Sequence, residues 1–447
     1  MFSAGFASVD ITPPLGLGLQ GYAKYRPADG ILDPLQLNAV AFSDGENQAV
    51  LITADLLYVM ENAATEIREK IAETCNIPVD HIFMQGLHQH TSLRIGSRPH
   101  ISAGFQDKGY LDILYRKYCD VVSLALADLQ EAEIVVGEGQ TAKQLSFIRR
   151  FRMKDGSVLT NPGRLNPDIV EPLGKPDNTV RLVRMKRAAG GDIALVQFSC
   201  HPDCIGGTKY TADWPGAVRR TVEKDLPGVH CILVNGPQGD TNHVDVSYER
   251  LQYPREQYGN IFPRYEYIHY MARLICDVVL ANWDTATPKQ TGKIFGQVVM
   301  KYIPTNTRGM DRVEQCQKEW EDIRSGKKEA PKDIGVHGEI MRIAQLPNEL
   351  LYQKVPVSFL GIGEVAFVGF GGEAFTHYAD VSIALGKEMY VIPATLTNGG
   401  QGYLPTTAAF EEGGYEVVTS RFSETIEPIL VGAVEELLDN YRKEKTC

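Results

Sequence analysis

The sequence has no long hydrophobic run, and basic residues are the minority among its charged residues. No apolar stretch of the 447 residues approaches the roughly 20 that a membrane-spanning helix needs. Residues 1–10 have neither a basic segment nor a long apolar core, so we expect no signal peptide. The 45 Lys and Arg against 56 Asp and Glu give a net charge of −11. Nucleic acids and anionic membranes attract basic surfaces, so neither is expected as a partner.

Cysteine is sparse, and its distribution excludes a disulfide framework. The eight cysteines are scattered, and several lie in apolar surroundings, such as Cys231, as buried reduced thiols do. Cys200 and Cys204 flank His201, but the sequence has no second cysteine pair to complete a structural zinc site. We therefore expect a cytoplasmic protein, with a secreted protein whose leader has been removed as the alternative.

Apolar runs of strand length alternate with segments of helical periodicity. This alternation is typical of an α/β fold, and we expect a single large catalytic domain over residues 1–447, with a mixed β-sheet core flanked by helices. Strands are expected at residues 37–42, 49–54, 82–86, 133–136, 180–185, 193–199 and 231–235. Helices are expected at residues 61–75, 110–129, 217–225, 267–282 and 424–441. Residues 351–370, with a Gly-Ile-Gly-Glu centre, predict an antiparallel hairpin.

Two segments interrupt the alternation. Residues 149–178 are rich in Pro, Gly and Asn, and Met153-Lys154-Asp155-Gly156 within them predicts a hairpin turn. The rest of this segment has no periodicity, and a long loop in a compact protein is usually functional or disordered. Residues 313–335 are charge-rich and predict a helix and linker that extend into solvent. The sequence contains no internal repeat that we can detect.

Histidine is also scarce, with ten in the chain, yet two of them form the motif His88-Gln89-His90. This motif directly follows the apolar run 82–87, and side chains at i and i+2 of an extended segment point to the same side. If the strand formed by the run 82–87 continues through the motif, both imidazoles face one small volume. There both can bind one metal ion, or one can bind a metal ion and the other a substrate. Two histidines with ordinary hydrogen bonds or solvent contacts are the alternative.

Another histidine, His201, follows the apolar run 193–198, which predicts a buried strand ending beside it. Sites in open α/β sheets gather outside strand ends, so two such histidine motifs favour a shared metal site. A catalytic zinc needs about three protein ligands and one open position. A carboxylate is therefore the missing ligand type.

Two carboxylates follow other predicted strands. Glu373 precedes a helix and is our candidate third ligand, although the helix dipole alone would also favour it there. Asp55 follows the strand 49–54 and could either orient a metal-bound histidine or cap the next helix. The glycine-rich loop 398–406 carries Tyr403, whose hydroxyl could contact an oxyanion or a cation, or whose ring could simply pack.

In their order along the chain, these motifs resemble the N-terminal catalytic domain of the neutral, non-lysosomal ceramidases. The resemblance runs from residue 5 to about residue 416 and rests on residues 5–21, His88-Gln89-His90-Thr91, Arg149-Arg150, Cys200-His201-Pro202, Gly239-Asp240, Gly372-Glu373-Ala374-Phe375 and Gly402-Tyr403-Leu404-Pro405-Thr406. Each motif is loose by itself, whereas the ordered set is specific.

The resemblance implies a zinc-dependent amidase. The zinc ligands that it implies are His88, His201, Glu373 and Tyr403. It also implies that His90 and Arg149 assist catalysis. Gly400 stands where the family carries another loop tyrosine, so Tyr415 is the alternative to Tyr403.

The chain departs from the family at positions that face the substrate. The family motif His-Thr-His-Ser-Gly-Pro reads His-Gln-His-Thr-Ser-Leu over residues 88–93. Asn242 and His243 stand where the family carries a serine before a proline, and Ile148 replaces an asparagine before the arginine. We also expect no C-terminal immunoglobulin-like domain, because the chain ends in the predicted helix.

Three hypotheses about function follow. The first is a ceramidase-like zinc hydrolase that cleaves an amide (N-acyl) bond of a small-molecule or lipid-like substrate with metal-activated water. In it, Arg149 or Tyr403 stabilises the oxyanion, and His90 carries a proton to the leaving amine. The second is a zinc-dependent hydrolase or lyase acting on a small polar substrate such as a sugar or uronate derivative. The third is a non-catalytic binding protein.

The shape and lining of the pocket separate the first two hypotheses. An apolar tunnel would favour a lipid, whereas a short pocket lined by Arg, Asn and Asp would favour a polar ligand. The sequence leaves open whether the chain forms a homo-oligomer.

Overall fold

One chain path occurs three times in the molecule. The computed structural model describes residues 1–22, 26–96, 107–248 and 263–446. Each repeat has three successive strands paired antiparallel, a helix, a fourth strand parallel to the third, and a closing helix. The first repeat comprises β1 (Ser3–Asp10), β5 (Gln36–Ser43), β6 (Gln48–Ala54), α1 (Glu61–Cys75), β8 (Ile82–Gly86) and α2 (Lys108–Ala127).

The other two repeats follow the same order. The second comprises β10 (Gln130–Gln140), β15 (Thr179–Arg187), β16 (Ile193–Phe198), α3 (Asp213–Asp225), β18 (His230–Asn235) and α4 (Pro263–Trp283). The third comprises β21 (Ile294–Pro304), β22 (Tyr352–Ile362), β23 (Val365–Phe370), α7 (His377–Leu385), β25 (Tyr390–Ala394) and α10 (Ile426–Thr446). The recurrence lies in the chain path, because the sequence itself showed no internal repeat.

The first two repeats share one sheet. β1 and β10 pair antiparallel and join two four-stranded halves in the order β18-β16-β15-β10-β1-β5-β6-β8, with β20 (Thr287–Lys289) added on β10. The third repeat forms a separate sheet in the order β21-β22-β23-β25. Each sheet contains parallel and antiparallel pairs, so the predicted α/β class with a mixed-sheet core is confirmed. The division into two sheets was not predicted.

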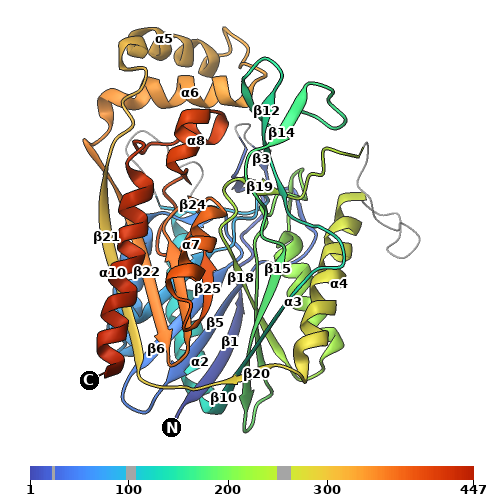
Figure 1. The fold of residues 1–447 in the computed structure, drawn as a ribbon, viewed down its shortest axis with the longest axis vertical. Helices are drawn as coiled ribbons and strands as arrows, with labels where there is room; N and C mark the ends of the chain where they lie inside the picture. The colour runs from blue at the N-terminus through green and yellow to red at the C-terminus, as the bar shows by residue number, and fades with distance from the viewer. Residues whose placement is uncertain (23–25, 97–106, 249–262, 447) are drawn as a thin grey trace.

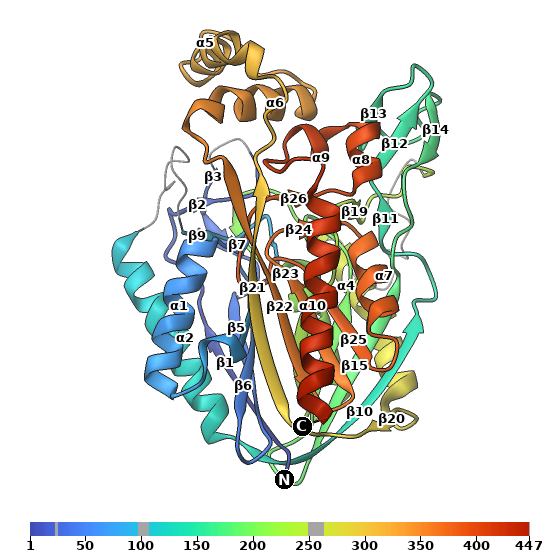
Figure 2. The same cartoon turned by 60° about the vertical axis from the view of Figure 1, so that its left-hand side comes forward.

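The two sheets pack face to face, and helices cover both outer faces (Figures 1 and 2). Between the sheets, Phe42 and Phe83 meet Phe367 with ring centroids 6.5 and 6.1 Å apart. Helices α1 and α2 cover one half of the large sheet, α3 and α4 cover the other half, and α7 and α10 cover the small sheet. Residues of β6 contribute alternately to the helix-facing and the sheet-facing core, so this strand is apolar at successive positions.

The strand directions place the carboxyl ends of the three parallel pairs at one end of the molecule (Figure 1). The described parts of the long connections between the first and second strands of the repeats, residues 11–22, 26–35, 141–178 and 305–351, lie at this same end. The second connection contains β12 (Arg150–Met153) and β13 (Val158–Thr160), which form the predicted hairpin. The third contains α5 (Val313–Arg324) and α6 (Ile334–Gln345), which pack on each other in the charge-rich segment.

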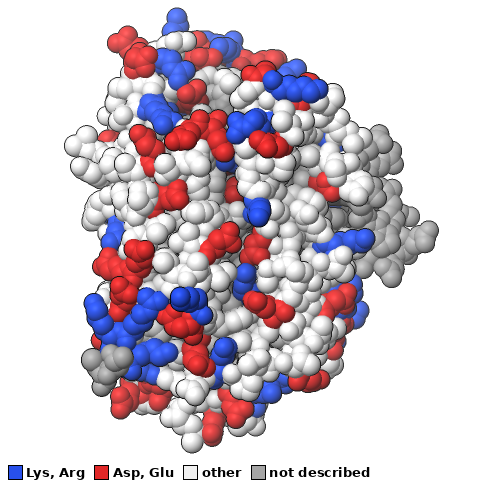
Figure 3. All heavy atoms as spheres, in the orientation of Figure 1, with Lys and Arg blue, Asp and Glu red and all other residues white. Residues whose placement is uncertain are grey.

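Most predicted elements are present, with shifted ends. The hairpin predicted within residues 351–370 is formed by β22 and β23. The strand predicted at residues 133–136 extends over all of β10, because its second half carries Gly and Glu, which hide the apolar pattern. Among the described residues, no helix combines the length and hydropathy that a bilayer crossing requires. On the face drawn in Figure 3, Lys and Arg side chains are interspersed with Asp and Glu.

A buried ion pair joins the first repeat to the second. Asp55 directly follows β6 and is fully buried, and its Oδ1 accepts a hydrogen bond of 3.0 Å from Nη1 of Arg219 in α3. Arg219 is also buried, and its second terminal nitrogen donates to the other carboxylate oxygen of Asp55. Two such hydrogen bonds fix the relative position of β6 and α3, the elements that flank the histidine motifs.

We expect Arg219→Met to lower the free energy of unfolding by about 3–5 kcal/mol, because it leaves the Asp55 carboxylate buried without its partner. Urea unfolding followed by circular dichroism would measure the change. Lys70→Met is the matched control, because it breaks the exposed pair with Glu66 on α1, which is worth less than about 1 kcal/mol. Similar small losses in both variants would contradict the assignment.

Candidate metal centre

Three imidazoles meet at the carboxyl ends of strands from the first two repeats. Nε2 of His88 lies 3.1 Å from Nε2 of His201. Nε2 of His90 lies 3.2 Å from Nε2 of His201 and 3.4 Å from Nε2 of His88. The three side chains are almost excluded from solvent, and together they form a group able to hold a metal ion. The third repeat adds Glu373, whose Oε2 lies 3.3 Å from Nε2 of His88. The fold thus brings four of the predicted site residues together.

His88 reaches this position through a turn. β8 ends at Gly86, and His88 has a φ of 80°, in the left-handed region that non-glycine residues rarely adopt. Its Nδ1 lies 3.0 Å from the carbonyl oxygen of Leu57, so Nδ1 carries the proton and the Nε2 lone pair faces the other histidines. The strand therefore does not continue through the motif, yet both imidazoles share one volume.

Gln89, between the two histidines, is held by Asp55. Its Nε2 donates a hydrogen bond of 2.8 Å to Oδ1 of Asp55, the carboxylate already fixed by Arg219. Asp55 does not cap α1, whose N-cap is Met60, and no hydrogen bond within the described ranges joins it to an imidazole. Asp55 instead fixes the histidine motif through its middle residue, a role that neither sequence alternative included.

His201 follows β16, as predicted, and its Nδ1 lies 3.5 Å from the carbonyl oxygen of Gln238. The loop after β18 that carries Gln238 packs tightly on the backbone of the third repeat. A Cβ on Gly239 would lie 2.3 Å from the carbonyl oxygen of Glu373, so only glycine allows this approach. The glycine-rich segment after β18 therefore brings the second repeat against the carboxylate supplied by the third.

Glu373 and Tyr403 are neighbours across a short parallel strand pair. They are register partners in β24 (Glu373–Ala374) and β26 (Tyr403–Leu404). The Tyr403 ring lies edge-on to that of Tyr415, with centroids 5.5 Å apart, so the two tyrosines considered as ligands are in contact. Within the described ranges, no hydrogen bond joins the Tyr403 hydroxyl to an imidazole.

Arg149 is buried beside these tyrosines and is firmly held. Its Nε donates to Oε1 of Glu416 at 2.8 Å, and its Nη2 donates to the carbonyl oxygen of Gly239 at 2.8 Å. The guanidinium carbon lies 5.3 Å from the ring centroid of Tyr403. Burial alone would lower the pKa of Arg149, but Tyr403, Glu416 and Glu373 together raise it. The guanidinium is therefore a permanent positive charge next to the imidazoles.

Burial favours the neutral form of the His90 and His201 imidazoles. Loss of solvation, assisted by His88, lowers the pKa of His90 to about 3, and burial together with Arg149 lowers the pKa of His201 well below its ordinary value. Burial alone would raise the pKa of Glu373, but the neighbouring His88 and Arg149 lower it. Neutral imidazoles and an ionised carboxylate are the protonation states that metal binding requires.

The distances fit a tetrahedral zinc ion. Two nitrogen ligands of such an ion lie about 3.3 Å apart, and the three imidazole nitrogens are separated by 3.1 to 3.4 Å. Oε2 of Glu373 is buried and accepts no hydrogen bond from the described residues. An orphaned buried carboxylate oxygen is costly unless it is paired or coordinates a metal. The donor set therefore suits a divalent cation that prefers nitrogen and oxygen ligands.

Two aromatic residues at the site were not found by sequence analysis. The ring of Tyr58 stacks on His88 with centroids 6.1 Å apart, and Tyr22 lies edge-on to His90 at 4.9 Å. A Cβ on Gly400 would lie 2.4 Å from Tyr58, so Tyr58 fills the space that a side chain at position 400 would need. Glu416, the buried partner of Arg149, was also missed. None of these residues lies in a pattern that marks it before the fold is known.

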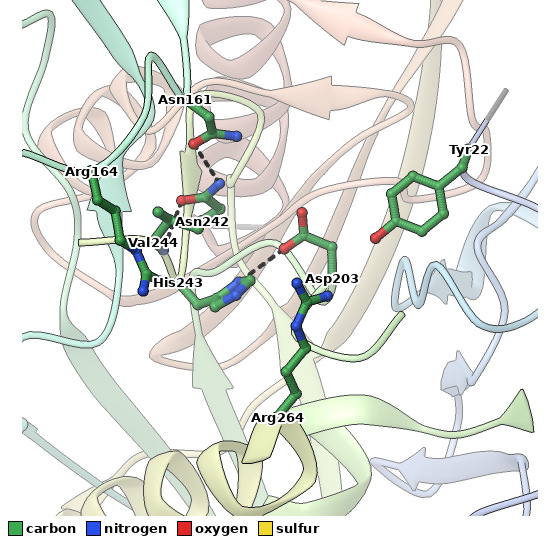
Figure 4. A pocket seen from close by; sticks show the side chains of 8 residues that line it. All are labelled: Tyr22, Asn161, Arg164, Asp203, Asn242, His243, Val244 and Arg264. Atoms are coloured by element: carbon green, nitrogen blue, oxygen red, sulfur yellow. Dashed lines mark hydrogen bonds and ion pairs between the residues drawn. The ribbon is translucent and has the colours of Figure 1, made fainter. Parts of the chain in front are cut away.

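A cavity of about 420 Å³ opens beside the histidines (Figure 4). Its lining residues are Tyr22, Asn161, Arg164, Asp203, Asn242, His243, Val244 and Arg264. Tyr22 connects this wall to His90, and Asp203 follows His201 by two residues. Most lining side chains carry a polar or charged group, the Tyr22 ring adds apolar surface, and Val244 is the one aliphatic side chain.

Solved structures share this architecture. A superposition on neutral ceramidase from Pseudomonas aeruginosa covers 98% of this chain and 75% of that chain, with a TM-score of 0.72 and 14% identity. The chain has the neutral ceramidase fold. A ceramidase complexed with C2 gives the same TM-score over 99% of this chain and 75% of that chain, at 13% identity. No family model and no curated protein matches the sequence, so the ceramidase likeness lies in the fold.

We expect the protein to bind one zinc ion per chain, and His88→Ala or His201→Ala to weaken zinc binding by more than about a hundredfold. Loss of an outer partner alone costs about 10–100-fold in metal affinity, and loss of a ligand costs more. Elemental analysis after dialysis against buffered zinc would measure this. His377→Ala, which removes an exposed histidine paired with Glu427, should keep its zinc. Stoichiometric zinc in a His88/His201 double variant would refute the site.

Proposed function

We propose that the protein is a zinc-dependent hydrolase that cleaves an amide (N-acyl) bond. The observation that carries this proposal is the convergence of three Nε2 atoms and the Glu373 carboxylate at one end of a ceramidase fold. The resemblance of the sequence motifs to the ceramidase family supports the same reaction class. Because a fold does not fix a function, the donor set and the residues around it carry the argument.

In this proposal, His88, His201 and Glu373 hold the ion, and Tyr403 is a further ligand that would still leave a position for water, because catalytic zinc can take a fifth ligand. A bound zinc ion supplies Lewis-acid polarisation of a carbonyl group and makes water nucleophilic at neutral pH. The hydrogen bond from Nδ1 to the Leu57 carbonyl supports His88 as a ligand, because it fixes the ring and its tautomer. The register pairing with Glu373 supports Tyr403, since it keeps the phenol beside the carboxylate.

His90 is the proton carrier in this proposal. Its Nε2 faces the other imidazoles, and its Nδ1 has no hydrogen-bond partner among the described residues, although it is buried. A neutral imidazole with a free ring nitrogen can accept a proton from the attacking water and return it to the leaving amine. This role agrees with the one that the resemblance gives to His90.

Arg149 stabilises the oxyanion that forms when water adds to the amide carbon. Its Nε and Nη2 are already engaged by Glu416 and Gly239, so the guanidinium is held in place before substrate binds. A preorganised positive charge in a site from which water is excluded stabilises developing negative charge strongly. Tyr403, under the same guanidinium, can contribute its hydroxyl to the same oxygen.

We also propose that the protein works in the cytoplasm. The seven cysteines within the described ranges are all free thiols. Burial raises the pKa of the Cys200 and Cys231 thiols well above the ordinary value, which makes them inert packing residues. Free structural thiols of this kind are typical of proteins in reducing compartments.

We expect His90→Ala to retain zinc and to lower kcat on an N-acyl substrate by about 10²–10⁴-fold, the usual contribution of a positioned acid–base group. Quantifying the released amine, together with the zinc content of the same sample, would test this. His377→Ala is the control for both measurements. Loss of zinc in the His90 variant would instead make His90 a ligand.

Removal of the metal is a separate test. Dialysis against a strong zinc chelator is expected to abolish turnover, because the zinc-free protein lacks the Lewis acid. Addition of one equivalent of zinc is expected to restore turnover. The rate of amine release from a panel of short- and long-chain N-acyl compounds would be followed before and after dialysis. Full turnover by verified zinc-free protein would exclude the proposal.

A further inference from the structure

We infer that the cavity beside the histidines receives the carboxylate of a small polar substrate, so that the compound cleaved carries an anionic group near its N-acyl bond. The statement that an N-acyl bond is cleaved near this cavity rests on the proposed function. The anion site itself depends only on the cavity and would stand if the reaction were a different one.

The first observation is unpaired positive charge in the cavity wall. Arg164 lies in the long connection of the second repeat and Arg264 in the first turn of α4, and both side chains line the cavity (Figure 4). Neither guanidinium has an ion pair or hydrogen bond with any residue that the structure describes. The one carboxylate of the wall, Asp203, already has a partner, because its Oδ1 lies 3.0 Å from Nδ1 of His243. The cavity wall therefore carries positive charge that no carboxylate of the described residues pairs with, although the chain as a whole carries a net charge of −11.

Guanidinium groups and carboxylates form short, charge-assisted hydrogen bonds, often two at a time. Two arginines on one wall without carboxylate partners are therefore complementary to an anionic ligand group. Asp203 does not remove this complementarity, because its Oδ1 is already engaged by Nδ1 of His243 at 3.0 Å.

The second observation is an amide donor at the cavity, the Nδ2 group of Asn161. Nδ2 of Asn242 donates to Oδ1 of Asn161 at 2.9 Å, and Oδ1 of Asn242 accepts from the backbone of Val244 at 2.9 Å. The Nδ2 group of Asn161 thus remains as a donor at the cavity, with no partner among the described residues. Asn161 also has a φ of 52°, and non-glycine residues held in this region cluster at ligand sites.

The third observation is continuity between this wall and the metal centre. The backbone N–H of Asn161 donates to the carbonyl oxygen of Arg149 at 2.8 Å, so the hairpin that carries the oxyanion-stabilising arginine also carries part of the cavity wall. On the opposite side, Tyr22 contacts His90, and the backbone N–H of Asp203 donates to the carbonyl oxygen of His201 at 3.0 Å. A ligand with its anionic end in the cavity can therefore extend toward the imidazoles.

The same wall is unsuited to a long hydrocarbon chain. An acyl chain gains from burial only against apolar surface, and Val244 is the single aliphatic side chain here. Such a chain would also remove water from Arg164 and Arg264 without replacing their hydrogen bonds. A cavity of about 420 Å³ is within the usual range for small-molecule sites. The composition of the wall therefore favours an N-acylated carboxylic acid over a lipid.

The first test compares matched substrates. The probes are N-acetyl-L-glutamate, its neutral counterpart N-acetyl-L-glutamine amide, and a ceramide with a six-carbon acyl chain. We expect kcat/KM for the acid to exceed that for the amide by about 10–100-fold, as expected for hydrogen bonds to charged groups. The Arg164→Gln/Arg264→Gln double variant should bring this ratio close to one. Arg116→Gln, on the exposed face of α2, is the control and should keep the wild-type ratio.

The Arg164→Lys/Arg264→Lys double variant separates loss of charge from loss of fold, because it keeps both positive charges and should retain part of the preference. A ratio near one in the wild-type protein would overturn the inference. So would a ratio that both arginine double variants leave unchanged, or a kcat/KM for the ceramide above that for the acid.

The second test needs no turnover and separates this inference from the proposed function. Glutarate and its neutral diamide, glutaramide, have no N-acyl bond of the kind to be cleaved, and their affinities for the zinc-loaded protein can be measured by calorimetry. We expect glutarate to bind about 10–100-fold more tightly than the diamide, and this preference to be lost in the Arg164→Gln/Arg264→Gln double variant. That result supports the anion site even if no amide is hydrolysed. Undiminished glutarate binding in the double variant would place the carboxylate elsewhere and overturn the inference, even if hydrolysis is observed.

Discussion

The site depends on one geometric constraint, which is that separate pieces of chain must bring three imidazole nitrogens to within 3.4 Å of one another and a carboxylate oxygen to within 3.3 Å of one of them. Parallel strand pairs meet this constraint because their carboxyl ends lie at the same end of each sheet. The three repeats use it in the same way. The first supplies His88, the second His201 and the third Glu373, each from the residues that follow a strand of its parallel pair.

The residues suited to metal binding and the residues that line the cavity come from partly different segments of this fold. The groups suited to metal binding come from short segments at strand ends, where the packed sheets hold them. Three of the eight cavity-lining residues, Tyr22, Asn161 and Arg164, come from the connections between the first and second strands, and the other five come from segments that follow β16 and β18. Arg149 links the two sets, since it lies in such a connection and is fixed by Glu416 at the metal centre. Substrate preference can therefore change in the connections while the donor set stays the same.

The sequence predicted the parts of this molecule that local patterns encode. Apolar runs predicted most strands and the α/β class, and strand-end position indicated His88, His201 and Glu373 before any coordinates were known. Asp55 was noticed, but its contact with Gln89 was not predicted, because Arg219, which holds it, lies in a helix more than a hundred residues away. Tyr58 and Glu416 carry no local pattern either, since their roles arise only when distant segments pack together. The division into two sheets was missed because strands of both sheets, such as β16 and β23, are buried at every position, so their sequences do not show which sheet they join.

The order of the three repeats along the chain has a consequence for biosynthesis. Both imidazole-bearing repeats leave the ribosome before Glu373 has been made, and their shared sheet is joined by the antiparallel contact of β1 with β10. A nascent chain can thus complete its nine-stranded sheet while the ion site still lacks its only carboxylate from the third repeat. The complete set of donor atoms accordingly forms late, only after the last four-stranded layer has been translated.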